Sequence, residues 1–159
     1  MAKVYMMCGR LCSGKSTHAR EIRDEKHAVI LSVDEITLAL FGQDAGDKLD
    51  EYVARTEEYL LKKSVEIIRT GIDVVLDWGF WTKKEREHAG AFYREQGIES
   101  ELHYIDISEE EWEKRLRKRN RDVIENKTDA YYVDRGLADK FRAIFEKPGP
   151  EEIDVLIKG

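Results

Sequence analysis

The fold is decided by the stretch Gly9-Arg10-Leu11-Cys12-Ser13-Gly14-Lys15-Ser16, which spells the complete phosphate-binding pattern G-x-x-x-x-G-K-S. It follows an apolar run at residues 4–8 and opens a segment, residues 16–23, that is typical of a helix. A strand, a glycine-rich loop and a helix N-terminus are the context that this motif requires. Backbone N–H groups and the helix dipole attract an anion there. The sequence therefore predicts a site for a nucleoside triphosphate, with ATP and GTP both open at this point.

Each part of this loop has an expected task. Lys15 would reach the β- and γ-phosphates, and the Ser16 hydroxyl would bind Mg²⁺. The remaining nucleotide-binding candidates are Gly9, Arg10, Leu11, Cys12, Ser13, Gly14 and Thr17. Cys8 and Cys12 are expected to be reduced thiols, because the strand and the loop explain their positions and no further ligand lies nearby in the sequence.

Length and composition favour one globular domain. A chain of 159 residues holds one domain with a real core and is too short for two of ordinary size, so we expect a single domain over 1–159. No apolar run approaches the roughly 18 residues of a membrane helix, and the N-terminus lacks the layout of a signal peptide. We therefore predict a cytoplasmic location and no membrane partner, and leave the oligomeric state open. The net charge of −6 means that the overall electrostatics of the chain do not favour nucleic acid as a partner.

Apolar runs and helical patterns alternate along the chain. This alternation predicts βαβ units around a parallel sheet, that is, one α/β domain. The expected strands are 4–8, 28–34, 72–77, 101–107 and 153–157. The expected helices are 16–23, 49–68, 82–95, 108–120 and 130–145, with a polar loop at 121–130.

Two of these strands end in a carboxylate. Ligands of a parallel sheet bind beyond the carboxyl ends of its strands, so Asp34 and Asp77 are expected to converge near the γ-phosphate. One would hold Mg²⁺ or its water shell, and we assign this task to Asp77. The other would accept a proton from an attacking hydroxyl, and we assign this task to Asp34, with Glu35 as the alternative. Capping of the following helix is a structural explanation for Asp34 that stays open.

An aromatic cluster follows the third strand. Trp78, Phe80 and Trp81 would wall an acceptor pocket, or they would pack over the edge of the sheet. The sequence leaves both interpretations open.

A strongly charged helix, residues 108–120, allows three interpretations. It is a solvated helix with acids first and bases last, an arm that binds nucleic acid, or a lid whose arginines stabilise charge on the transferred group. We favour the lid, over roughly residues 112–135. Arg115 and Arg119 share a face beside Trp112 and Leu116, so they are the expected inward pair. Arg117 and Arg121 are expected to be more exposed.

A motif near the end of this region is misleading. Asn126-Lys127-Thr128-Asp129 matches the guanine-binding signature of GTPases, but in GTPases it follows an apolar strand. Here only Val123 and Ile124 before it are apolar, and the Asp-x-x-Gly expected after the third strand is missing. We interpret residues 121–130 as the tip of the lid.

The chain resembles small P-loop kinases. It is similar to the group that contains the 5′-hydroxyl kinase domain of polynucleotide kinases, chloramphenicol phosphotransferase and zeta-type toxins, over nearly its whole length. More narrowly, Leu76-Asp77-Trp78-Gly79-Phe80-Trp81 with Glu85-Arg86 resembles a set of predicted bacterial ATP-binding kinases of the AAA type. The resemblance implies a three-layer P-loop NTPase fold with a five-stranded parallel sheet ordered 2-3-1-4-5. It also implies Mg-ATP as the donor, Asp34 as the general base and Arg86 at the active site.

These observations predict an ATP-dependent phosphotransferase. It would move the γ-phosphate of Mg-ATP to a hydroxyl of a small molecule or nucleotide-type acceptor, using Lys15, Asp34, Arg115 and Arg119. An NTP-binding regulatory switch without an acceptor is one alternative, and a polynucleotide 5′-hydroxyl kinase is another. Nucleic acid is an allowed partner that the acidic composition does not favour.

Overall fold

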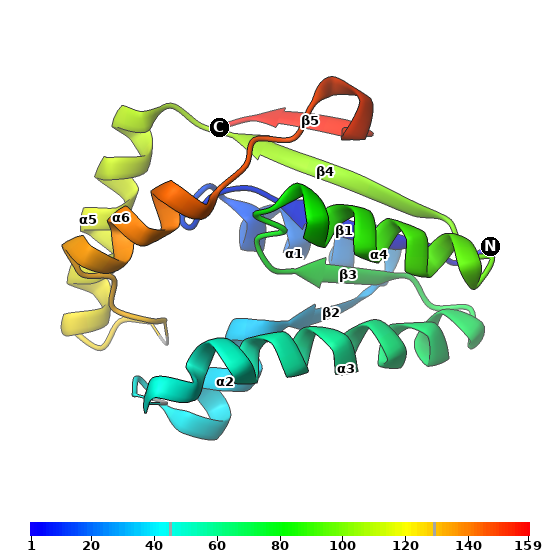
Figure 1. The fold of residues 1–159 in the computed structure, drawn as a ribbon, viewed down its shortest axis with the longest axis horizontal. Helices are drawn as coiled ribbons and strands as arrows, with labels where there is room; N and C mark the ends of the chain where they lie inside the picture. The colour runs from blue at the N-terminus through cyan, green and yellow to red at the C-terminus, as the bar shows by residue number, and fades with distance from the viewer. Residues whose placement is uncertain (45, 129) are drawn as a thin grey trace.

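The computed structural model describes residues 1–44, 46–128 and 130–159 (Figure 1). Strands and helices alternate through most of the chain, as the sequence predicts. The strands are β1 (Val4–Cys8), β2 (Val29–Ser32), β3 (Val74–Asp77), β4 (Ser100–Asp106) and β5 (Val155–Lys158). The helices are α1 (Lys15–Lys26), α2 (Val33–Phe41), α3 (Leu49–Arg69), α4 (Lys83–Glu95), α5 (Glu109–Ile124) and α6 (Arg135–Ile144). Short 3₁₀ turns occur at Gly46–Lys48 and Pro150–Glu152.

The five strands form one parallel sheet in the order β2-β3-β1-β4-β5. The predicted fold class and strand order are therefore confirmed. β1 lies in the middle, where Val4 pairs with Val74 of β3 and with Ser100 of β4. β3 and β2 pair up to Ser32 and Asp77, so the carboxyl ends of both strands lie beside the loop that follows β1.

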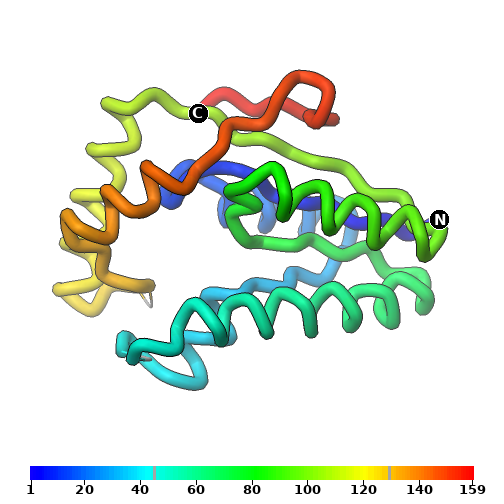
Figure 2. Tube along the Cα trace, viewed as in Figure 1, coloured from blue at the N-terminus to red at the C-terminus, as the bar shows by residue number. Residues whose placement is uncertain are grey.

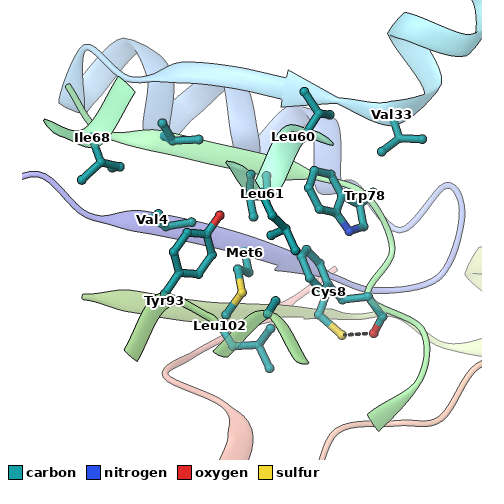
Figure 3. Close-up of a cluster of buried hydrophobic side chains, with 14 of the residues drawn as sticks. Val4, Met6, Cys8, Val33, Leu60, Leu61, Ile68, Trp78, Tyr93 and Leu102 are labelled. Atoms are coloured by element: carbon teal, nitrogen blue, oxygen red, sulfur yellow. Dashed lines mark hydrogen bonds between the residues drawn. The ribbon is translucent and has the colours of Figure 1, made fainter. Parts of the chain in front are cut away.

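Helices cover both faces of this sheet. α3 and α4 lie on one face and α1 lies behind the other (Figure 1). On the first face, Leu60, Leu61 and Tyr93 pack against Val4 and Met6 of β1 in the largest core cluster (Figure 3). Ala19 and Ile22 of α1 form a smaller cluster with other residues of β1 and β3 on the opposite face. Every residue of β1 is buried, so the phosphate-binding loop extends from the most enclosed part of the molecule.

The boundary between β2 and α2 differs from the prediction. The strand was expected to run to Asp34, but it ends at Ser32 and α2 begins at Val33. The reason is a cap, since the Ser32 hydroxyl accepts a hydrogen bond from the Glu35 N–H at 3.2 Å. Asp34 therefore lies in the first turn of the helix, and Ser32 is the N-cap residue.

Two boundaries near the predicted lid also differ. α5 continues to Ile124 rather than ending near residue 120, and α6 begins at Arg135 rather than at 130. Asp134 sets the second boundary, because its side chain accepts a hydrogen bond from the Leu137 N–H at 2.8 Å. Residues 130–134 therefore have no regular secondary structure, and the expected loop at 121–130 is partly helical.

α5 and α6 lie together beyond the carboxyl ends of the strands, at the same end of the molecule as α2 (Figure 2). They pack through Trp112, Leu116, Val133 and Ala138, against Leu11 of the phosphate-binding loop. Within the described residues, none of the helices combines the length and the apolar character that crossing a bilayer would require.

Candidate active site

The phosphate-binding loop has the backbone of an anion site. Gly14 is the N-cap residue of α1 and has φ 104°, a left-handed conformation that favours glycine. Within the described part of the chain, no side chain caps this helix and its first turn contains no acid. The free N–H groups of the first turn and the positive end of the helix dipole are therefore available to a phosphate.

Lys15 lies across this loop. Its Nζ donates hydrogen bonds to the carbonyls of Gly9, at 3.1 Å, and Arg10, at 2.8 Å. Burial lowers the pKa of its ammonium group, while Asp77 and Asp34 act in the opposite direction. Neutral carbonyls are weaker partners for an ammonium than a phosphate is, so a bound triphosphate would replace them favourably.

Ser16 and Asp77 meet at the mouth of the loop. The Ser16 hydroxyl donates a hydrogen bond to Asp77 Oδ2 at 2.9 Å, across 61 positions of sequence. β3 delivers the carboxylate and the first turn of α1 delivers the hydroxyl. The two residues that the sequence assigns to Mg²⁺ therefore lie side by side.

Asp34 faces the same group of charges. Although the residue is exposed to water at the start of α2, protein atoms also surround its carboxyl group. This burial raises its pKa, Arg119 and Lys15 oppose the rise, and Asp77 adds to it. Glu35, the alternative proton acceptor, is exposed on the same turn of α2.

Both arginines of the predicted inward pair reach the phosphate-binding loop. Arg115 Nη1 donates to the Ser13 carbonyl at 3.0 Å, and its Nε pairs with Glu111 at 2.9 Å. Arg119 Nη1 lies 3.7 Å from Cys12 Sγ. Arg117 and Arg121 are exposed, as the helical spacing predicts.

Trp112 fixes this helix to the loop. Its indole is fully buried, and Nε1 donates to the Leu11 carbonyl at 2.6 Å. The guanidinium groups of Arg10 and Arg142 lie 5.3 and 4.8 Å from the centre of its ring. The position of α5 is thus tied to the conformation of the loop.

Arg86 is buried behind the loop that follows β3. Its side chain is buried, with Nη1 donating to the Phe80 carbonyl and Nε to Glu152, both at 2.9 Å. Nη2 approaches the second oxygen of Glu152 at 3.5 Å. The resemblance places Arg86 at the active site; in this structure its guanidinium group is engaged by Phe80 and Glu152 and supports the loop after β3.

The aromatic cluster after β3 is divided between the two interpretations. Trp78 and Phe80 are buried with their ring centres 5.1 Å apart, so they belong to the core rather than to an acceptor pocket. Figure 3 shows Trp78 among the other core side chains. Phe80 has φ 47°, which is strained for a bulky residue, and its carbonyl accepts hydrogen bonds from Cys8 and Arg86. Trp81 is partly exposed, and its indole lies so close to Gly79 that a Cβ there would be 1.7 Å from Nε1.

Both cysteines are free. Cys8 is buried, which raises its pKa to about 11, so it is an inert thiol at neutral pH. Asn126 follows α5 and not a strand, so the GTPase-like motif lacks the context it needs. Asp129, its last residue, lies outside the described residues.

A family model described as an AAA domain matches residues 4–148. The chain belongs to this family. Among proteins with curated functions, none matches the sequence. The match begins at β1 and ends after α6, so it includes the phosphate-binding loop and the whole of α5.

Solved structures share the fold of this AAA domain at low sequence identity. A protein from Chloroflexus aurantiacus described as a kinase has a TM-score of 0.74 and 12% identity, over 99% of this chain and 84% of that chain. A sugar kinase from Janibacter sp. HTCC2649 has a TM-score of 0.68 and 16% identity, over 99% and 86%. The APS kinase CysC of Mycobacterium tuberculosis, in complex with AMPPNP and APS, has a TM-score of 0.69 and 17% identity, over 99% and 88%. These similarities show a small P-loop kinase fold.

Three residues near Asp34 were missed by the sequence analysis. The side chains of Thr37 and Gln43 form hydrogen bonds with residues 130–132, and Tyr131 provides one of the partners. No sequence motif marks a buried threonine near the start of a helix. The same is true of a tyrosine in a short irregular segment. Only their contact in space, 94 positions apart, reveals them.

Proposed function

We propose that this AAA domain is an ATP-dependent phosphotransferase that moves the γ-phosphate of Mg-ATP to a hydroxyl. One observation carries the proposal: Asp77 at the end of β3 and Asp34 in the first turn of α2 lie at the edge where β2 and β3 last pair, and both act on Lys15 of the phosphate-binding loop. A nucleotide-binding site alone needs one carboxylate for the metal. A second one gives the site a proton acceptor, which transfer to a hydroxyl requires.

The donor side is formed by residues 9–17, Asp77, Arg115 and Arg119. Lys15 would leave its two carbonyl partners and bind the β- and γ-phosphates, with the N–H groups of the first turn of α1 around them. Arg115 and Arg119 already lie against the loop, at Ser13 and Cys12. They would offset negative charge as the bond from the γ-phosphorus to the β-phosphate oxygen breaks.

The residues present at the loop mouth fit a magnesium ion. Mg²⁺ prefers hard oxygen ligands and usually takes one or two from protein, with the rest from water and phosphates. The hydrogen-bonded oxygens of Ser16 and Asp77 provide such a pair. Within the described residues, no cluster of three or more His, Cys, Asp or Glu is placed to cage a metal, which agrees with this shared mode of binding. The ion would neutralise charge on the β- and γ-phosphates.

The acceptor side is formed by residues 32–43, 78–82 and 130–133. Asp34 would accept the proton of the acceptor hydroxyl while the hydroxyl oxygen bonds to the γ-phosphorus and ADP leaves. Glu35 is the alternative base, and the positive charge of Arg119 acts on Asp34 by opposing the rise in its pKa. Trp81 is the residue of the aromatic cluster that stays partly exposed, and its ring packs against Phe141 of α6.

Replacement of the base tests the function. Asp34→Asn should retain binding of Mg-AMPPNP and reduce acceptor-stimulated ADP release by about 100-fold or more, since a general base contributes 10²–10⁴-fold. The assay screens neutral sugars, nucleosides and 5′-hydroxyl oligonucleotides as acceptors. Glu35→Gln on the same helical turn tests the alternative base and should stay near normal if Asp34 is the base. Nearly normal turnover in Asp34→Asn would refute the assignment, and tight nucleotide binding without stimulation by any acceptor would favour the regulatory switch.

One feature favours a polynucleotide 5′-hydroxyl kinase as a second candidate. The outer face of α5 has an open groove of about 450 Å³, lined by Lys114, Arg117, Asn120, Arg121, Ile124 and Tyr132. A cationic groove with an exposed aromatic ring is the type of surface that binds single-stranded nucleic acid. Oligonucleotide affinity that falls steeply with salt would support this candidate, and affinity independent of salt would exclude it.

A further inference from the structure

Residues 130–133, which we name the strap, have no regular secondary structure and lead into α6. Two side chains from different elements form hydrogen bonds with the backbone of the strap. Gln43, just after α2, donates to the Ala130 carbonyl at 2.5 Å and accepts from the Tyr132 N–H at 3.1 Å. Asn120 of α5 donates to the Val133 carbonyl at 2.6 Å and accepts from its N–H at 2.9 Å. The strap therefore bridges the acceptor side and the lid helix.

Tyr131 occupies the middle of this bridge and contacts both sides. Its carbonyl accepts a hydrogen bond from Arg119 Nε at 3.2 Å. Its hydroxyl donates to Thr37 Oγ1 at 2.7 Å, and Thr37 is completely buried. Thr37 Oγ1 in turn lies 3.4 Å from the Asp34 carbonyl. A continuous series of hydrogen bonds thus runs from Arg119 through Tyr131 and Thr37 to the peptide group of Asp34.

We propose that Tyr131 is a positioning residue that couples the lid arginine Arg119 to the helix that carries Asp34. This inference rests on the proposed function, in which Arg119 acts on the transferred phosphate and Asp34 acts on the acceptor. Neither hydrogen bond of Tyr131 touches the nucleotide or the acceptor. Its task is to keep two reacting groups from separate elements in one arrangement, because a misplacement of about 1 Å can cost roughly 100-fold in rate.

The coupling predicts a response of α2 to nucleotide. A phosphate bound by Arg119 stabilises the arrangement in which Arg119 also holds Tyr131, and so stabilises the bond from Tyr131 to α2. Binding of Mg-AMPPNP should therefore slow hydrogen exchange in residues 33–41 as well as in residues 9–17. In Tyr131→Phe, which keeps the ring and removes the hydroxyl, slowing at 9–17 should remain and slowing at 33–41 should be lost.

Two further variants make the test specific. Tyr132→Phe removes the neighbouring hydroxyl, from a residue that is 47% exposed and contributes its backbone N–H to the strap, so the response of α2 should persist. Thr37→Val keeps the shape and removes the acceptor oxygen, so it should reproduce Tyr131→Phe. The double variant should then resemble either single variant, because both remove the same hydrogen bond.

Three results would overturn the inference. Slowing at 33–41 that survives in Tyr131→Phe shows that the hydroxyl carries no coupling. Slowing confined to 9–17 in the unaltered protein shows that the lid and α2 respond separately. Absence of slowing at 9–17 in every variant shows that nucleotide is not bound there, which refutes the proposed function and the inference together. With a known acceptor, Tyr131→Phe should lower kcat about tenfold and change KM for ATP less than twofold, since it removes one hydrogen bond outside the nucleotide site.

Discussion

The donor side and the acceptor side of this site are constructed differently. On the donor side, the anion site itself consists of eight consecutive residues whose backbone binds the phosphates, and Asp77, Arg115 and Arg119 add side chains to it from other elements. On the acceptor side, residues that are far apart in sequence meet through side chains. Gln43 holds the strap across 87 and 89 positions, and Arg86 holds Glu152 across 66.

This difference has a consequence for specificity. A loop that binds through its own backbone contacts the phosphates, which all nucleoside triphosphates share. Such a loop tolerates few substitutions, and its sequence therefore identifies the chemical class of the donor. Side chains contributed by α2, the loop after β3 and the strap can be exchanged one at a time while the sheet stays the same. Variation in substrate among proteins with this fold is therefore expected on the acceptor side.

The largest effect on stability is expected from removing the ion pair between Arg86 and Glu152, which lies behind the acceptor side. Arg86→Ala should lower the free energy of unfolding by about 3–5 kcal/mol, because it leaves the Glu152 carboxylate without its buried partner. The side chains of the pair are only 3% and 15% exposed. It also removes a donor from the carbonyl of the strained Phe80. Chemical denaturation measures the loss.

Arg94→Ala is the matched control for this prediction, because Arg94 is on the same helix and exposed. Its effect should stay within about 0.5 kcal/mol. A loss below about 1 kcal/mol in Arg86→Ala would show that the acceptor side does not depend on this pair.

The next effect concerns the donor side. Lys15→Ala should weaken binding of Mg-AMPPNP about 100-fold, close to 2.7 kcal/mol, because a hydrogen bond to a charged group is lost. The stability of the fold should change little, since the hydrogen bonds of this lysine within the described residues go to carbonyls of the loop itself. Titration calorimetry measures the affinity. Lys26→Ala, exposed at the far end of α1, should bind normally, and unchanged affinity in Lys15→Ala would place the phosphates elsewhere.

The sequence predicts the donor side and the sheet because both depend on local patterns. The phosphate-binding motif, the apolar runs and the N-cap residues Thr82 and Ser108 are all visible without neighbours in space. The spacing of Arg115 and Arg119 beside Trp112 gave their direction for the same reason, since one helical face is set by sequence alone.

The acceptor side could be predicted only in part. Ser32 and Asp34 are both good N-cap residues, and the choice between them depends on how far β2 pairs with β3. Arg86 is placed at the active site by resemblance, but its direction is set by Glu152, which lies beyond the match to the family. The role of Tyr131 depends on the fold bringing α2 under the strap, and no local pattern encodes that contact.

The smallest effect is a dependence of stability on pH that the acceptor side should show. Glu57, half-buried on α3, has its pKa raised from 4.5 to about 7, first by burial and then by repulsion from Glu85 and Glu58. Glu85 in turn accepts a hydrogen bond from the Trp81 N–H at 3.2 Å, so the Glu85 carboxyl group lies behind the loop after β3.

The sign of the effect follows from the two pKa values. Below pH 4.5 Glu57 is protonated in both states and costs nothing. Between pH 4.5 and about 7 the unfolded chain loses its proton while the folded chain keeps it, so the free energy of unfolding falls as pH rises, and above that range the penalty is constant.

Glu57→Gln should therefore be more stable than the unaltered protein at pH 8, by about 2 kcal/mol. This is less than the roughly 3 kcal/mol of the full difference in pKa, because the side chain is partly solvated. Thermal unfolding at pH 4 and pH 8 measures it, and the advantage should vanish at pH 4. Glu66→Gln, exposed on the same helix, should show almost no dependence on pH, and an equal gain there would mean that general surface charge, rather than a buried carboxyl behind the acceptor side, is responsible.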